Sequence, residues 1–339
     1  APGRAHARWP DLGSRQSSGS SEQMPGGFPG RQRGLPLPKD QHLGAVAFSS
    51  ADGSRAMYAV PWGRTCIVGT TDVDHPGDLD QVCAMPEEVE GMVDAVNHAF
   101  PGAGLAREDI ISTFAGLRPL IGRGELTAYQ ASRDHQIVES DAGLVTISGG
   151  KLTTYRRMSE DLVDLVSEKL ESEYGVMTHA RCETDRVPLA EAAFGADALV
   201  TDLARQYPQL DLLVLGHAAQ TYGPATAGVL APLEKDPEMG ARVVPGLPYI
   251  RAEVPYAIQN EMAMTLSDWM IRRAHIMHED KDQGLASAPE VAALMAPYLG
   301  WDAGEVERQV GEYREQVRLS RSYRGELPDQ ALLESSHRM

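Results

Sequence analysis

Apolar residues recur in short segments separated by turn residues over the first half of the chain. From about Leu35 onward, runs of four to six mostly apolar residues are bounded by Gly, Pro, Asp and Ser. Such runs are typical of β-strands, and a Pro-Trp-Gly turn between two of them is typical of a β-meander. The predicted strands are 43–48, 56–60, 65–69, 110–115, 135–139 and 144–147.

Two helices are predicted among these strands. The first covers 86–100, where Pro86 occupies the first position and Glu87 and Glu88 favour the positive end of the helix dipole. The second is long and amphipathic, follows the glycine pair at 149–150, and has apolar residues at three- and four-residue steps. Its apolar stripe consists of Leu152, Tyr155, Met158, Leu162, Leu165, Val166 and Leu170.

After about Thr178 only helical patterns remain. The predicted helices are 196–207, 210–222, 251–280, 288–299 and 303–323. Strands with helices, then a connecting helix, then helices alone predict an α+β fold with an all-helical C-terminal domain. The expected domains are 35–177 and 178–325, followed by a tail at 326–339.

The first 34 residues differ from the rest of the chain. They are rich in Gly, Pro, Ser, Arg and Gln, have no helical or strand periodicity, and contain more basic than acidic residues. We predict a head, 1–34, that is disordered or that derives from outside the natural reading frame. The reason is that it offers too little apolar surface to offset the entropy lost on ordering.

The sequence GGKLTTYRRM, at 149–158, joins a predicted strand to the long helix. The first backbone N–H groups of a helix lack intrahelical partners, and the helix dipole favours negative charge there. Phosphate, carboxylate or the edge of a reduced flavin could bind at such a point. Lys151 adds a cation, and Thr153 and Thr154 add hydroxyls. A tight turn followed by an ordinary helix cap is the alternative, and both interpretations stay open.

Two arginines near strand ends are candidate anion ligands. Arg118, in FAGLRPL, ends an apolar strand and precedes Pro119, and Arg133 stands just before the next strand. A guanidinium at the rim of a sheet can clamp phosphate or carboxylate with two hydrogen bonds. Each arginine could equally be a solvated strand end.

The remaining polar motifs give weaker signals. The sequence VGTTD, at 68–72, is interpreted as a turn ordered by its own side chains. His275 and His278 are predicted to lie on the surface, and no metal site is expected. The G-x-G in IGRGELT, at 121–127, precedes no clear helix and is not taken as a dinucleotide fingerprint.

Composition narrows the classes of partner. The net charge of −17 argues against nucleic acid, because phosphate-backbone binding needs basic patches. It does not exclude an anionic substrate held by a few arginines. The three cysteines, without CxxC spacing, indicate neither a disulfide framework nor a zinc site, which fits a reducing, intracellular setting.

Four stretches, in this order, resemble the FAD-dependent, aerobic, quinone-linked glycerol-3-phosphate dehydrogenases. Each stretch alone is a weak signal, whereas the combination is specific and extends from about Leu35 to Tyr323. The stretches are YAVPWGRTCIVGTTDVDHPGD at 58–78, ISTFAGLRPL at 111–120, GLVTISGGKLTTYRRM at 143–158, and GLPYIRAEVPYAIQNEMAMTLSDWMIRRAHIMHEDKDQG at 246–284.

The resemblance implies a fold and a reaction. We expect the mixed-sheet substrate portion of a glutathione-reductase-like FAD oxidoreductase, followed by the helical domain. The family oxidises sn-glycerol 3-phosphate to dihydroxyacetone phosphate, passes hydride to FAD and then electrons to quinone. The resemblance further implies cytoplasmic localisation, with peripheral association with the inner face of the cell membrane and a homodimer left open.

The resemblance also assigns roles to individual residues. Gly149, Gly150, Lys151, Leu152 and Thr153 would contact the edge of the flavin ring. In addition, Arg118 would approach the substrate oxygens as the catalytic cation, and Arg133 and Lys151 would balance the phosphate charge. Three cations suit a buried dianion, because uncompensated burial of charge is prohibitive.

The chain departs from the family pattern at its start. No G-x-G-x-x-G follows a first strand, and no G-x-H element supplies a catalytic base. His42 does not fit that role. We therefore expect an incomplete fragment that is inactive alone and binds FAD weakly. The alternatives are a glycerol-3-phosphate oxidase that uses oxygen, a catalytically silent interaction fragment, and a relative of the amine and amino-acid oxidases.

Overall fold

The computed structural model describes most of the chain. The described residues are 19–26, 28–29, 44–50, 52–53, 55–75, 82–118, 134–177, 181–187 and 195–325. These residues divide between two compact units, one containing 1–22, 72–82 and 116–189 and the other containing 23–71, 83–115 and 190–339.

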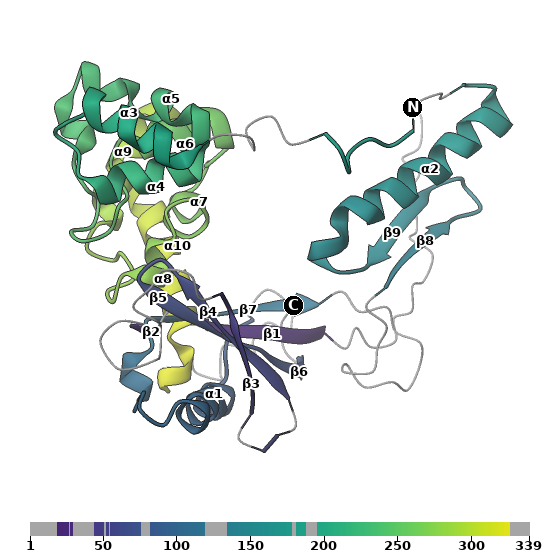
Figure 1. Cartoon of the computed structure of the whole chain (residues 1–339), viewed down its shortest axis with the longest axis horizontal. Coiled ribbons are helices and arrows are strands. Elements are labelled where there is room, and N and C mark those ends of the chain that lie inside the picture. The colour runs from purple at the N-terminus through teal and green to yellow at the C-terminus, as the bar shows by residue number, and fades with distance from the viewer. Residues whose placement is uncertain are drawn as a thin grey trace. The chain divides into compact units, whose positions relative to one another are not determined.

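The larger unit contains an antiparallel sheet of strand order β2-β5-β4-β3 (Figure 1). Strand β4 pairs with β5 from Tyr58 opposite Gly69 to Trp62 opposite Thr65, so a two-residue turn joins them. Alternate residues of β4 are buried, which matches a sheet with one face on a core. The bounds are β2 (Phe28–Pro29), β3 (Val46–Ser49), β4 (Ala56–Trp62) and β5 (Thr65–Gly69).

Helix α1 (Pro86–Ala99) packs on this sheet. Val89, Met92 and Val96, at helical spacing, are buried in one cluster with Cys66 and Val68 of β5. The capping box at its start supports the predicted N-terminus, because the Glu88 carboxylate accepts from the Met85 backbone N–H at 3.2 Å. The short helix η1 (Arg107–Asp109) follows α1.

A second sheet has the strand order β6-β1-β7, with β6 (Thr71–His75), β1 (Gly19–Gly26) and β7 (Ser112–Arg118). Strands β1 and β2 fall within the predicted head, 1–34, where the sequence pattern gave no strand. Pairing with other strands supplies backbone hydrogen bonds that local composition does not signal. Residues 1–18, 30–34 and the tail 326–339 lie outside the described residues, so the head and tail stay predictions.

The rest of the larger unit is helical, as predicted. Its main core surrounds Trp269, Met270, Met295 and Tyr313, all of them fully buried. The α-helices are α3 (Ala196–Gln206), α4 (Leu212–Tyr222), α5 (Thr226–Leu230), α6 (Glu253–Glu261), α7 (Leu266–Arg272), α8 (Ile276–Glu279), α9 (Ala288–Leu299) and α10 (Ala303–Ser320). Single turns occur at η3 (Gly223–Ala225), η4 (Ala231–Glu234), η5 (Pro237–Gly240) and η6 (Ser322–Arg324).

The prediction of one helix over 251–280 is wrong, because that stretch forms α6, α7 and α8. Two residues in the left-handed conformation, Met262 (φ 55°) and His275 (φ 52°), interrupt it. Thr265 then starts α7 through a capping box with Asp268. The apolar periodicity continues through both breaks, because all three helices face the same core, so periodicity alone did not reveal them.

The smaller unit contains a hairpin and one long helix. Strands β8 (His135–Glu139) and β9 (Val145–Gly149) pair antiparallel, with Ile137 opposite Ile147. The single turn η2 (Leu152–Thr154) leads into α2 (Tyr155–Tyr174), which ends at Gly175 (φ 67°). The predicted fold class, α+β with a helical C-terminal domain, is confirmed, while the predicted domain limits stay a prediction.

Candidate functional site

The turn between β9 and η2 has two consecutive left-handed glycines. Gly149 has φ 73° and Gly150 has φ 86°. Residues with side chains rarely adopt such angles, so this turn requires the glycine pair. It reverses the chain direction between the last pair of the hairpin, His135 opposite Gly149, and the start of the helix.

Gly150 is also required by packing. A Cβ atom on Gly150 would lie 2.5 Å from Sδ of Met158 and 3.3 Å from Cβ of His135. The Met158 side chain therefore occupies the space that any other residue at 150 would need. A side chain at position 150 would therefore require the flexible end of Met158 to move.

The residues that follow the glycine pair are open to solvent. Lys151, Leu152 and Thr153 are all exposed, and Leu152 is 89% exposed. The Thr154 hydroxyl donates to the Lys151 carbonyl at 2.9 Å and so closes the turn of η2. The first amides of a helix have no partner within it, so 151–153 present N–H groups, a cation and an apolar side chain at one point. This combination suits a planar, partly anionic ligand.

Ion pairs fix the helix on the hairpin below this turn. His135 of β8 lies 3.2 Å from the Asp161 carboxylate of α2, and Asp161 also pairs with Arg157 at 2.8 Å. Further along, Lys169 bridges Glu139 of β8 and Glu173. The hydrogen bond to Glu139, with that to Glu173, raises the pKa of Lys169. None of the α2 side chains is fully buried, and its apolar residues Leu162, Leu165, Val166 and Leu170 are half-buried beside these ion pairs.

The positions of the two predicted arginine side chains are not described by the structure. Arg118 is the last residue of β7, as predicted, but its side chain lies outside the described part of the structure. Arg133 and the G-x-G of 121–127 lie outside the described residues altogether, as does His42. The structure thus describes the predicted flavin-edge residues, 149–153, as one continuous turn. That Arg118, Arg133 and Lys151 converge on one phosphate stays a prediction.

The VGTTD stretch has a structural contact. Thr71 is buried, and its hydroxyl donates to the Glu88 carboxylate of α1 at 2.7 Å. Strand β6 begins at Thr71, whereas the sequence pattern suggested only a turn. The interpretation of this motif as a structural element agrees with that contact.

A buried polar cluster in the helical domain was not found from the sequence. Glu253, 2% exposed, accepts hydrogen bonds from the Tyr222 hydroxyl (2.9 Å) and the Ile250 backbone N–H (2.7 Å). Its carboxylate also lies 3.0 Å from Nε2 of His217. Burial raises the pKa of Tyr222, and the Glu253 charge raises it further. The only sequence signal was an acidic residue, Glu253, inside the otherwise mostly apolar LPYIRAEVPY.

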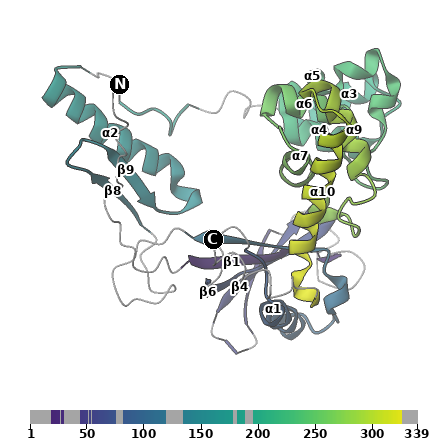
Figure 2. The same ribbon diagram turned by 180° about the vertical axis from the view of Figure 1, so that it is seen from behind.

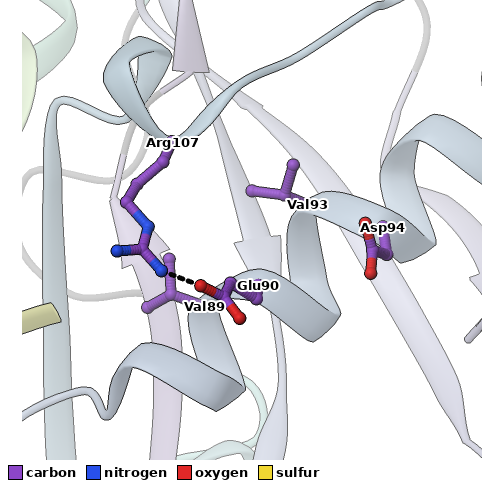
Figure 3. Close-up of a pocket in the computed structure, with 5 residues that line it drawn as sticks. All are labelled: Val89, Glu90, Val93, Asp94 and Arg107. Carbon is purple, nitrogen blue, oxygen red and sulfur yellow. Dashed lines mark hydrogen bonds and ion pairs between the residues drawn. The ribbon is translucent and has the colours of Figure 1, made fainter. Parts of the chain in front are cut away.

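A shallow groove of 330 Å³ lies beside α1 (Figure 3). It is lined by Val89, Glu90, Val93, Asp94 and Arg107, none of which the sequence analysis singled out. Figure 3 shows the Arg107 guanidinium reaching across to Glu90, with which it forms an ion pair. The groove's main cation is thus already neutralised by the protein.

Two features are absent from the described part of the chain. No cluster of three or more His, Cys, Asp or Glu side chains is arranged to hold a metal ion there. Likewise, none of the helices described combines the length and the apolar character needed to cross a membrane.

The fold is similar to that of a known dehydrogenase that binds FAD, and part of the sequence matches a known family. Residues 182–306 match the family model described as the C-terminal domain of alpha-glycerophosphate oxidase. The structure is similar to that of a glycerol-3-phosphate dehydrogenase from Bacillus halodurans complexed with FAD, with a TM-score of 0.72 and 26% identity. That similarity covers 89% of this chain and 57% of the other.

Named relatives agree with the structural similarity. The chain is 31% identical over 265 residues to a glycerol-3-phosphate dehydrogenase of Synechocystis sp., covering 77% of this chain and 47% of the relative. It is 33% identical over 276 residues to an aerobic glycerol-3-phosphate dehydrogenase of Staphylococcus saprophyticus, covering 79% and 48%. The chain is therefore similar to the glycerol-3-phosphate dehydrogenases, as its motifs predicted, and it spans about half the length of these relatives.

Proposed function

We propose that this chain carries the flavin-edge and phosphate-binding parts of a site that oxidises sn-glycerol 3-phosphate to dihydroxyacetone phosphate. FAD, when bound, would accept the hydride from the secondary alcohol. The observation that carries the proposal is the β9–η2 turn, where two left-handed glycines precede exposed Lys151, Leu152 and Thr153. The relatives, by their names, give the reaction class.

The residues at this turn fit the edge of a flavin. The open N–H groups at the start of η2 and the Lys151 ammonium would stabilise negative charge on the ring edge. Leu152, with its side chain almost fully in solvent, would pack against a flat apolar surface and so lose its unfavourable exposure. Met158 beneath Gly150 fixes the turn from the opposite side, so that ligand binding meets a preorganised backbone.

The substrate's phosphate requires cations. Arg118, Arg133 and Lys151 are proposed to share this role, with Arg118 approaching the oxygen that is oxidised. A guanidinium binds phosphate through two parallel hydrogen bonds and stays charged at any physiological pH. A buried dianion needs such compensation, because an unpaired charge in a low-dielectric site is prohibitively unfavourable.

The electron acceptor is proposed to be quinone. A cytoplasmic protein that can contact the inner face of the membrane would meet this acceptor, and a homodimer is left open. Oxygen is the second candidate acceptor. The family model that matches 182–306 is described from an alpha-glycerophosphate oxidase, which favours it.

Binding by the purified full chain tests the proposal. FAD and sn-glycerol 3-phosphate would be titrated separately, with flavin fluorescence and calorimetry as readouts, up to millimolar concentrations. We expect weak binding of both, and Lys151→Gln should weaken each by about tenfold, which is the loss of about 1.4 kcal/mol. Lys235→Gln, which removes an exposed lysine of the helical domain, is the matched control and should change neither. Equal affinities in the two variants would contradict the proposal.

A further inference from the structure

The short helix α8 and the loop after it connect the helical domain to the sheet of the larger unit. Two of its side chains, Ile276 and Met277, are buried in the helical core with Trp269. Its other two side chains have different neighbours: His278 lies beside β7, and Glu279 lies beside the β4–β5 turn. Figure 2 shows α10, which packs against the same core, running from the helices down to the sheet. The segment 275–283 is called the joint below.

The first contact of the joint is with the β4–β5 turn. The Trp62 ring lies edge-on to the His275 ring, with centroids 5.4 Å apart. Gly63 (φ 54°) leaves room for the Glu279 carboxylate, which would lie 3.3 Å from a Cβ at that position. The same carboxylate accepts from the Tyr249 hydroxyl at 2.8 Å, and Arg64 donates to the Gly246 carbonyl at 3.0 Å.

The second contact is with β7. Nδ1 of His278 lies 3.0 Å from the Ser112 hydroxyl, and its ring lies 5.5 Å from that of Phe114. Beside it, Ser320 at the end of α10 exchanges hydrogen bonds with Thr113: the Ser320 hydroxyl donates to the Thr113 carbonyl at 2.9 Å and accepts from the Thr113 N–H at 3.1 Å. The buried Gln283 side chain donates to the same hydroxyl at 3.0 Å.

The joint is built from polar contacts and strained backbone. Its two ends, His275 (φ 52°) and Gln283 (φ 55°), both have left-handed conformations that side chains rarely adopt. Such strain persists only where surrounding contacts hold it. The buried Ile276 and Met277 hold the joint to the helical core, so the polar contacts to β7 and to the β4–β5 turn are the part that local unfolding would open.

We propose that the joint is a releasable connection, which holds the helical domain on the sheet while its histidines are neutral and opens locally when His278 takes up a proton. The contacts on the β7 side, Ser112 and Phe114, are uncharged. No ion pair of His278 with a carboxylate occurs among the contacts described. A proton taken from solvent would therefore leave a poorly compensated cation between β7 and α8.

The surrounding charges do not reverse this conclusion. The charged and titratable groups at the joint include Arg64, His217, Tyr249, Arg273, Tyr313 and Arg321, besides His275, Glu279, Asp280, Lys281 and Asp282 of the joint itself. Burial, with the neighbouring His275, lowers the pKa of His278 to about 4. Burial likewise lowers the pKa of His275, with His217 and Arg273 adding to the effect. Burial raises the pKa of Glu279, so protonation of that group has the opposite effect and partly offsets the release.

Hydrogen exchange of the full chain, corrected for intrinsic rates, tests the proposal at about pH 7 and about pH 5. We expect the amides of 112–115 and 275–284 to lose about tenfold protection at the lower pH, while α9 keeps its protection. His278→Asn places an amide where Nδ1 was, keeps the Ser112 hydrogen bond and cannot titrate, so it should reduce the pH effect to the smaller part that His275 and Glu279 contribute. His98→Asn, on the exposed side of α1, should retain it.

Three results would overturn the proposal. These are no loss of protection in the wild-type joint, an equal loss in His278→Asn, and a parallel loss in α9, which would indicate global unfolding. If His278→Asn does not fold, Ser112→Ala provides the second test. It should lower protection of the joint at both pH values, and unchanged protection in that variant would equally contradict the proposal.

Discussion

Met158 of α2 lies over Gly150 so closely that a Cβ on the glycine would be 2.5 Å from the methionine sulfur. A side chain at position 150 would thus meet the helix that follows the turn. This contact and the left-handed angles of Gly149 and Gly150 fix the backbone from which Lys151, Leu152 and Thr153 project. The glycine pair therefore has a structural role. By fixing the backbone it would also hold residues 151–153 in position for a ligand.

The first prediction separates packing from backbone strain at this turn. Gly150→Ala should destabilise the chain by about 2–4 kcal/mol, because the left-handed angle and the overlap with Met158 both oppose a side chain. Gly143→Ala is the control: Gly143 has φ 80° but open space around it, so the cost should be only about 1–2 kcal/mol. Urea unfolding followed by circular dichroism measures both. Equal losses of unfolding free energy in the two variants would mean that the Met158 side chain moves aside without a measurable penalty.

The second prediction concerns the buried carboxylate of the helical domain. Tyr222→Phe removes one of the donors to Glu253 and should lower the free energy of unfolding by about 1–3 kcal/mol, because a buried acceptor loses a partner. Tyr298→Phe, at an exposed position of α9, should change it by less than about 0.5 kcal/mol. A neutral Tyr222→Phe in thermal and urea denaturation would show that the cluster contributes nothing to stability.

The third prediction concerns thiol chemistry. Burial raises the pKa of the Cys66 thiol to about 11, and the side chain is 1% exposed. The thiol therefore stays protonated until the pH approaches that value, and the reactive thiolate is scarce near pH 8. Maleimide labelling followed by mass spectrometry should modify Cys66 at least about 100-fold more slowly than Cys182, which is half-buried. Comparable rates would place Cys66 outside a stable core.

The fourth prediction addresses Arg118. If its guanidinium holds the substrate phosphate, Arg118→Lys should weaken binding of sn-glycerol 3-phosphate by roughly 30-fold, about 2 kcal/mol, because a point charge loses the paired hydrogen bonds. Calorimetry gives the affinity, and the melting temperature serves as the control for folding. A stably folded variant with wild-type affinity would remove Arg118 from the site.

The sequence predicted those elements whose periodicity is local. Strand β8 and helix α9 have the predicted bounds, and α1 begins at the predicted Pro86. Strands β1, β2 and β6 were missed, because their partner strands come from other parts of the chain. The stretch 251–280 was predicted as one helix, because left-handed residues such as His275 leave the apolar spacing almost unchanged.

The candidate site was predictable only in part. The glycine pair at 149–150 was recognisable because a strand, two glycines and a helix follow one another directly in the sequence. The prediction that His275 and His278 lie on the surface is wrong, since both are half-buried. Their burial comes from Trp62 and Ser112, which are far away in sequence, and no local pattern carries such contacts.

Residue-resolved NMR of the full chain during a titration with FAD shows whether the β9–η2 turn contacts the flavin. We expect the backbone amide shifts of 149–153 to move saturably, and Lys151→Gln to reduce their apparent affinity, while the amides of α9 stay in place. Amides of 149–153 that do not move at millimolar FAD, or that move no more than those of α9, would contradict that contact.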